Sequence, residues 1–216
     1  MTEQILDSAQ RFVQTHGYHG FSYANIAEEV GIRKASIHYY YPAKADLGTA
    51  LVRRYREHIR QSADAVTQGT VGADEQLQRY AQIFRDRLRG GPAGGGVCLC
   101  GVLSAEWPSL PESVRVEVGV FFAENEAWLS GVMERGCAAG LLRFSATAPV
   151  QAAAFLAGLE GALLSARAHQ DVTLYCAIAH QLLGQMGIDT LDIYPVTTEW
   201  IAPVSFVRPN YALSES

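Results

Sequence analysis

Cysteine, lysine and long apolar runs are scarce in this sequence. Its 216 residues include only four cysteines and two lysines, Lys34 and Lys44. No cysteines form a CxxC pair, and a chain of this length needs no disulfide staples, so we expect reduced thiols. No apolar run approaches the roughly 20 residues of a membrane-spanning helix. The chain does not open with a basic segment followed by an apolar one. Together these absences predict a soluble, cytoplasmic protein.

Motifs of common enzymes are also missing. The sequence contains no GxSxG, no glycine-rich phosphate loop, no HExxH and no paired carboxylates with a positioned base. We therefore expect no enzymatic activity, no cofactor and no metal site.

The residues that are abundant favour a helical protein. Hydrophobic residues make up 49% of the chain, and they recur at the spacing of amphipathic helices. Alternating strand patterns are absent before residue 189, so the prediction is an all-α fold. We expect a helix-turn-helix domain at 1–48, a larger helical domain at 49–188 and an extended tail at 189–216. The predicted helices span about 3–16, 23–30, 34–40, 44–66, 73–89, 97–107, 110–139, 147–168 and 171–186.

Charge is distributed unevenly along the chain. Residues 1–60 contain eight basic and six acidic side chains, a net charge of +2, whereas the remainder has nine and sixteen, a net charge of −7. A basic amino-terminal module on an acidic body suggests a local contact with a polyanion.

Residues 22–41 have the pattern of two short helices joined by a glycine-containing turn. Such a pair is typical of the helix-turn-helix, in which the second helix enters the major groove. The second helix presents a cation, a hydroxyl, an imidazole and phenols, groups that contact phosphates and base edges. These side chains are Lys34, Ser36, His38, Tyr39 and Tyr40.

Because they contain this helix-turn-helix pattern, residues 3–50 resemble the DNA-binding domain of the tetracycline-repressor (TetR) family of transcriptional regulators. The match is carried by residues 21–47, FSYANIAEEVGIRKASIHYYYPAKADL. The resemblance implies a repressor that binds a palindromic operator as a homodimer and is released by a small apolar or aromatic effector. It also implies roles for particular positions: Ser22 caps the motif and meets a phosphate, and Lys44 binds a phosphate. The recognition helix would contact DNA through Lys34, Ala35, Ser36, His38, Tyr39 and Tyr40.

Three positions depart from the usual pattern of the family. Arg33 stands where a capping serine is common, and we expect it to add a phosphate contact. His38 replaces a tyrosine, and Tyr41 replaces a phenylalanine. Tyr41 is expected in the core. The arginines of the next helix, Arg53, Arg54, Arg56 and Arg60, are expected on a solvated face.

Aromatic and polarizable residues of the second domain suggest an effector pocket with apolar walls. The predicted lining residues are Cys98, Trp107, Phe121, Phe122, Asn125, Trp128, Cys137 and Phe155, with Glu106, Glu124 and Glu160 as further candidate polar anchors. The 90–96 loop is either a gate to this pocket or disordered. For the dimer, the prediction is a four-helix bundle of the last two helices and their mates. Its small residues are Gly158, Gly161, Ala162 and Ser165, and its apolar residues are Leu159, Leu163, Ile178 and Leu182.

Two other functions stay open. Cys98 and Cys100 suggest a thiol-sensing or metal-sensing regulator, although two residues about 200° apart on a helix cannot face one metal; in extended chain they could. A helical binding protein without DNA contact is the other alternative, and the placement of the two lysines argues against it.

Overall fold

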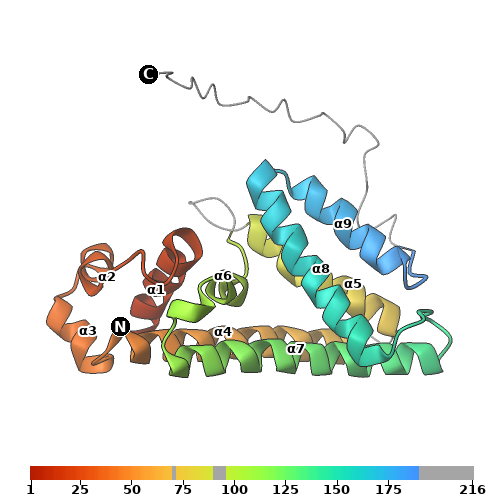
Figure 1. Ribbon diagram of the computed structural model, residues 1–216, viewed down its shortest axis with the longest axis horizontal. Helices are drawn as coiled ribbons and strands as arrows, with labels where there is room; N and C mark the ends of the chain where they lie inside the picture. The colour runs from red at the N-terminus through yellow and green to blue at the C-terminus, as the bar shows by residue number, and fades with distance from the viewer. Residues whose placement is uncertain (70–71, 90–95, 190–216) are drawn as a thin grey trace, which may run out of the picture.

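The computed structural model describes residues 1–69, 72–89 and 96–189, and this part of the chain is all-α, as predicted (Figure 1). The predicted helix boundaries lie within three residues of those observed. Helix α6 starts at Leu99, two residues later than predicted, which leaves Cys98 as its N-cap. The elements are α1 (Thr2–His16), α2 (Tyr23–Val30), α3 (Lys34–Tyr40), α4 (Lys44–Gly69), α5 (Ala73–Arg89), α6 (Leu99–Ala105), the 3-10 turn η1 (Trp107–Ser109), α7 (Glu112–Ala138), α8 (Ala148–His169) and α9 (Val172–Gly184).

The first three helices form a small head at one end of the molecule (Figure 1). Ile5, Ile26 and Ile37 are fully buried, one from each helix, so the head has its own apolar centre. The turn between α2 and α3 depends on Gly31, which has φ 73° and ψ 34°. Glycine adopts this left-handed conformation without the steric penalty of a Cβ atom. The turn allows α3 to leave α2 with one face free.

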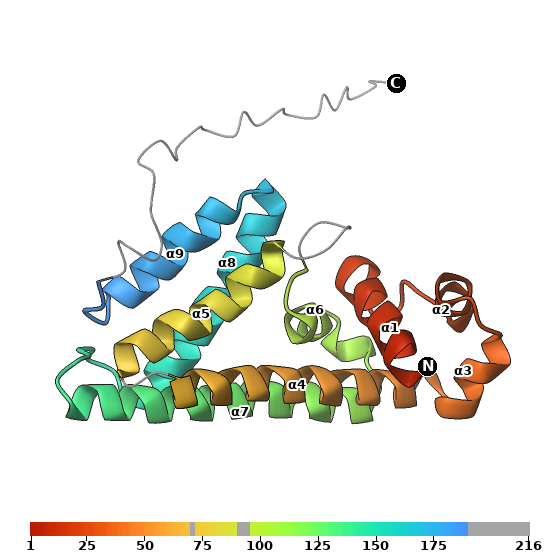
Figure 2. The same cartoon turned by 180° about the vertical axis from the view of Figure 1, so that it is seen from behind.

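The body is built on two long helices that run side by side in the same direction, α4 and α7 (Figures 1 and 2). Their register is visible in pairs such as Thr49 with Ser113 and Thr67 with Trp128. Helices α5, α8 and α9 pack above this pair, and α6 lies between them and the head (Figure 2). Because α4 starts in the head and ends under the body, it connects the two parts mechanically.

Helix α8 is more apolar than inspection of the sequence suggests. Its most apolar 18-residue window has a mean hydropathy of 1.3, and one third of that window is buried. By length and composition alone, the helix could cross a membrane. Within the protein α8 packs between α7 and α9. Gly158 permits close approach to α9, since a Cβ atom there would lie 2.7 Å from Leu182 Cδ1. The remaining apolar surface of α8 is a candidate contact for a partner.

Candidate nucleic-acid interface and effector site

Helix α3 presents a continuous exposed face. Ile37 is buried and anchors the helix, whereas Tyr39 is 81% exposed and stands edge-on to Tyr40 at 5.1 Å between ring centroids. A shallow hollow of about 430 Å³ joins Arg33, Ala35, Ser36, Tyr39 and Tyr40 to Met1. An exposed phenol pair beside an arginine and a hydroxyl contributes nothing to the core, so this face is available for a ligand.

Lys34 and His38 lie outside that hollow. Both are exposed, but the His38 ring packs edge-on against Tyr23 at 4.7 Å, and its Nδ1 lies 3.3 Å from the carbonyl oxygen of Pro42. Tyr41 is buried, as predicted, and its carbonyl accepts a hydrogen bond of 2.9 Å from the Tyr23 hydroxyl. The end of α3 is therefore tied to the start of α2.

Ser22 and Lys44 occupy neighbouring places at the base of the head. Ser22 is the N-cap of α2, and its hydroxyl and backbone N–H both donate to Asn25 Oδ1, at 2.7 and 2.9 Å. Lys44 Nζ donates to the carbonyl of Phe21 and lies 4.0 Å from the centroid of the Phe21 ring. Burial lowers the pKa of Lys44, and the nearby Glu106 carboxylate opposes this effect. The ammonium thus sits next to the helix N-terminus that Ser22 caps.

The residues predicted to line the effector pocket are spread over the second domain, and the pocket stays a prediction. Trp107 is exposed in η1, whereas Cys137 is exposed near the opposite end of the long α7. Cys98, Phe121 and Phe155 are fully buried core residues, and Phe122 and Trp128 pack partly against that core.

Asn125 is likewise engaged in the core. It accepts 2.6 Å from the Tyr80 hydroxyl and donates 2.7 Å to the Phe121 carbonyl. Trp128 stacks on Tyr80, with 5.1 Å between ring centroids. Asn125 and Trp128 are therefore held by contacts between α5 and α7.

A polar cluster is buried between α4, α6 and α8. It brings Cys98 and Cys100 together with Tyr55 and Glu160. Burial raises the pKa of Glu160 to about 10, so this carboxyl group is neutral at neutral pH, and its Oε1 has no hydrogen-bond partner in the described part of the chain. Burial opposes the thiolate of Cys98, but the neighbouring side chains of Cys100, Glu160 and Tyr55 favour it and lower the pKa of Cys98 to about 6.

The two thiols lie closer together than the helical prediction allows. Residues 97 and 98 precede α6, and Cys98 is its N-cap with φ −57° and ψ 129°. The extended backbone turns the Cys98 side chain toward Cys100, and the two groups interact. The extended-chain alternative therefore applies at Cys98. No cluster of three or more metal-ligating side chains occurs within residues 1–69, 72–89 and 96–189.

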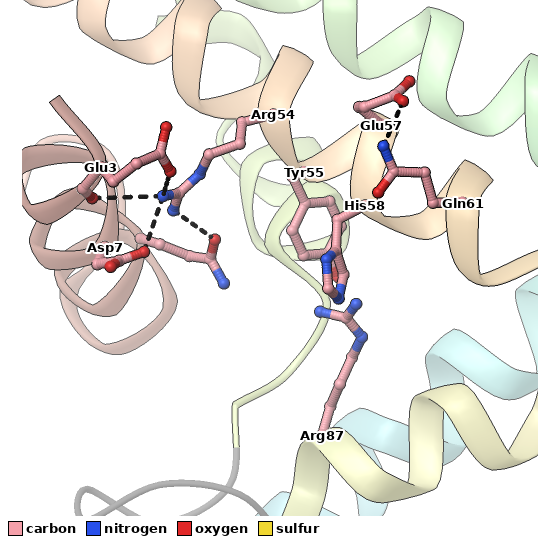
Figure 3. A pocket seen from close by; sticks show the side chains of 9 residues that line it. Glu3, Asp7, Arg54, Tyr55, Glu57, His58, Gln61 and Arg87 are labelled. Carbon is pink, nitrogen blue, oxygen red and sulfur yellow. Dashed lines mark hydrogen bonds and ion pairs between the residues drawn. The ribbon is translucent and has the colours of Figure 1, made fainter.

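A cleft of about 460 Å³ opens between α1, α4 and α5 (Figure 3). None of the predicted pocket residues lines it. Its floor is Tyr55, and Arg87 points across it with the guanidinium carbon 4.8 Å from the centre of the Tyr55 ring. The full lining is Glu3, Asp7, Gln10, Arg54, Tyr55, Glu57, His58, Gln61 and Arg87. Tyr55 also neighbours Cys98, so its side chain lies between the cleft and the buried polar cluster.

Two of the arginines assigned to a solvated face are instead structural. Arg54 donates to Glu3 and Asp7 of α1, at 3.0 and 2.7 Å, and to Gln10 at 3.2 Å. Its side chain is only 23% exposed. This contact joins α4 to the head.

Arg56 joins α4 to α7 in the body of the molecule. It donates to Glu117, which is 8% exposed, and to Glu124 at 2.6 Å. Arg53 also pairs with Glu117, at 2.7 Å. Arg60, by contrast, is exposed and pairs only within its own helix, as expected. The sequence shows which positions of α4 are arginines, but it does not show which neighbouring helices carry the carboxylates that bind them.

The predicted dimer residues are divided between the core and the surface. Leu159, Ala162 and Leu163 are buried within the monomer, so they are unavailable to a partner. The exposed face of α8 carries a different set at helical spacing: Val150, Ala154, Ala157, Gly161, Leu164 and Ala168. The predicted gate at 90–96 and the tail at 189–216 lie almost wholly outside the described residues, so their roles stay predictions.

Comparisons with known proteins agree with this architecture. Residues 5–51 match the model of bacterial regulatory proteins of the tetR family, and residues 73–182 match a tetracyclin repressor-like C-terminal domain. The transcriptional regulator AcuR of Cereibacter sphaeroides is 28% identical over 171 residues, covering 76% of this chain and 75% of AcuR.

Solved structures show the same similarity. A TetR-family regulator from Agrobacterium tumefaciens is 37% identical with a TM-score of 0.82, covering 86% of this chain and 96% of that one. A TetR regulator from Legionella pneumophila is 27% identical with a TM-score of 0.78, covering 86% and 97%.

Proposed function

Because the chain belongs to the TetR family of transcriptional regulators, we propose that it is a ligand-responsive repressor. It binds a palindromic operator in the cytoplasm as a homodimer and leaves the DNA when a small organic effector binds. We propose a regulatory role without catalysis. The observation that carries the proposal is the exposed face of α3, which offers a cation, a hydroxyl and two phenols on a helix whose other side is anchored in the head.

The proposed DNA interface divides into two kinds of contact. Tyr39, Tyr40 and Ser36 lie on the exposed face and would meet base edges, whereas Arg33 and Lys34 would meet phosphates. Lys44 supports a further phosphate contact because it stands beside the capped N-terminus of α2, where the amide groups and the ammonium attract the same anion. Ser22, Ala35 and His38 complete the proposed set.

The proposed dimer uses the apolar stripe on α8. Leu164 is 54% exposed and Val150 is 60% exposed, and residues of this kind are rarely left in contact with water over a long stretch. Small residues between them allow two helices to approach closely. A twofold axis along this face places two heads on the same side of the dimer, and recognition helices in successive major grooves must lie about 34–36 Å apart.

Operator binding tests the proposal directly. The full-length chain is mixed with DNA from its own promoter region, and affinity is measured as a function of salt. Lys44→Ala is expected to weaken binding to all sequences and to lower the salt slope by about one. Tyr39→Ala is expected to weaken binding with no loss of thermal stability, since this ring is exposed.

Arg60→Gln provides the control, because it removes one positive charge from α4 far from α3. A Lys44→Ala slope equal to that of wild type contradicts the phosphate contact. Failure of wild type to bind any promoter fragment contradicts the proposed function itself.

A further inference from the structure

Arg87 is a shielded cation without an acidic partner. Its Nε is buried and makes no hydrogen bond within the described part of the chain, and none of the described carboxylates pairs with its guanidinium. Its guanidinium lies over the face of the Tyr55 ring, and its charge acts on the buried Glu160 carboxyl group. By contrast, Arg54 and Arg56, which are also shielded, each bind two carboxylates. A shielded cation is costly unless an anion accompanies it.

The charges in the cleft are separated into two ends (Figure 3). At the α1 end, Glu3 and Asp7 are already occupied by Arg54. At the other end His58 stands beside Arg87 and Tyr55 (Figure 3). Glu57, the third carboxylate of the lining, is bound by Arg60 and Gln61.

The field at the Arg87 end is positive. The pKa of His58 is lowered by burial and then by the positive charges of Arg87 and Arg54. An anion placed between His58 and Arg87 would reverse this effect and raise the pKa of the imidazole. The cleft therefore contains two unused donors, an aromatic floor and space of about 460 Å³.

We propose that this end of the cleft binds a small organic carboxylate, whose oxygens accept hydrogen bonds from the fork of Arg87 beside His58. This inference rests on the proposed function, since the carboxylate is the effector of the regulator. Planar guanidinium and carboxylate groups match in geometry, which favours a carboxylate over a spherical anion. The ligand would touch α4 and α5 on the side that faces α1.

Benzoate is the test ligand, and benzamide is its neutral counterpart of the same shape. Binding to the DNA-free protein is measured by calorimetry at constant ionic strength, up to about 10 mM ligand. Benzoate is expected to bind at least tenfold more tightly than benzamide. Arg87→Gln is expected to weaken benzoate binding about 10- to 100-fold, which corresponds to the loss of a charged hydrogen bond. Arg79→Gln, an exposed position on the same helix, is expected to bind as wild type does.

The titration of His58 supplies a second readout. Followed by NMR, its pKa is expected to rise when benzoate is added to wild type and to stay unchanged in Arg87→Gln. The groups around this imidazole are Arg54 and Glu57 on α4, Arg87 on α5, and Glu3 and Asp7 on α1. Equal affinities for benzoate and benzamide, no binding of benzoate, or full binding by Arg87→Gln would each overturn the proposal.

Folding of the variant is checked separately. Removing Arg87 breaks no ion pair in the described part of the chain, and Glu160, on which the charge of Arg87 acts, has a pKa of about 10 and is neutral. The melting temperature of ligand-free Arg87→Gln is therefore expected to equal or exceed that of Arg79→Gln. A lower value would make Arg87 a structural residue and overturn the proposal. Arg87→Lys, which keeps the charge but loses the fork, is expected to bind benzoate with intermediate affinity.

These measurements are made without DNA, so they are distinguishable from the proposed function. Operator binding by wild type together with failure of benzoate to bind overturns the carboxylate site alone. Benzoate binding by a chain that binds no promoter fragment overturns the repressor function and supports the site.

Discussion

Replacement of Arg56 tests how α4 is held to the body. This guanidinium makes two hydrogen bonds to Glu124 and one to Glu117, and its side chain is 19% exposed. Arg56→Gln leaves the nearly buried Glu117 with only Arg53, which is 66% exposed. Hydrogen bonds to charged groups contribute about 1.5–3 kcal/mol each to stability. Because Glu124 is exposed, water hydrates its carboxylate in the variant and offsets part of that loss. We expect Arg56→Gln to lower the free energy of unfolding by about 2–4 kcal/mol.

The matched control is Arg60→Gln, one helical turn further along α4. Arg60 is 53% exposed and pairs with Glu57 and Asp64 of its own helix. Exposed pairs of this kind contribute about 0.3–0.5 kcal/mol. For a protein of this size about 1 kcal/mol shifts the melting temperature by roughly 2–4 °C, so Arg56→Gln is expected to melt about 5–12 °C below wild type and Arg60→Gln within about 2 °C.

Calorimetric melting at one protein concentration measures both variants, since the proposed dimer makes the melting temperature depend on concentration. A double-mutant cycle with Glu124→Gln isolates the contact with α7 and is expected to give a coupling energy of about 0.5–3 kcal/mol. Equal melting temperatures for Arg56→Gln and Arg60→Gln would refute the reasoning, because the distinction between them rests wholly on burial and partners.

Two further predictions concern the dimer and the buried carboxyl group. Leu164→Asp places a charge on the exposed stripe of α8 and is expected to halve the mass measured by light scattering while helical content is retained; an unchanged mass would locate the dimer elsewhere. Glu160 has a folded pKa of about 10, above its unfolded value, so the stability it confers is complete below the unfolded pKa and is lost as pH rises toward 10. With Cys98→Ala as background, where burial still raises the pKa of Glu160, Glu160→Gln is expected to gain stability over its parent as the pH rises from 6 to 8. Parallel stability curves would show that burial does not hold the carboxyl group neutral.

Much of the fold was predictable because local signals and tertiary packing agree. Apolar residues at helical spacing are buried throughout, as with Leu47, Leu51, Tyr55 and Ile59 on α4. Helix ends coincide with residues whose backbone preferences end helices, such as Gly31. The exposed face of α3 was predictable for the same reason: only Ile37 of that helix is buried, so its polar and phenolic residues had to face outward.

Partners across helices were not predictable. Arg54, Arg56 and Arg60 look alike along the chain, yet the first joins the head, the second joins α7 and the third remains in water. Their difference depends on the register between α4 and its neighbours, which no local pattern specifies. The predicted pocket residues were chosen by residue type, which does not specify which of them lie together, and Trp107 and Cys137 lie near opposite ends of α7. The actual cleft is lined by polar residues of α1, α4 and α5, which have no common motif.

The positions of Arg54 and Arg56 suggest how the binding of an effector would change the affinity for DNA. Arg54 ties α4 to α1, Arg56 ties α4 to α7, and the cleft with Arg87 lies on the head side of α4. A ligand there changes the operator affinity only as far as it binds the released and DNA-bound arrangements differently. Moving the population from 1:99 to 99:1 requires a difference of about 10⁴-fold in affinity, roughly 5.5 kcal/mol. A single carboxylate on Arg87 supplies about 1.5–3 kcal/mol per charged hydrogen bond. The two hydrogen bonds of a bidentate pair therefore supply the required roughly 5.5 kcal/mol only if both are absent in the DNA-bound arrangement. The position of the Arg87 guanidinium in the two arrangements thus decides whether a ligand in this cleft can release the DNA.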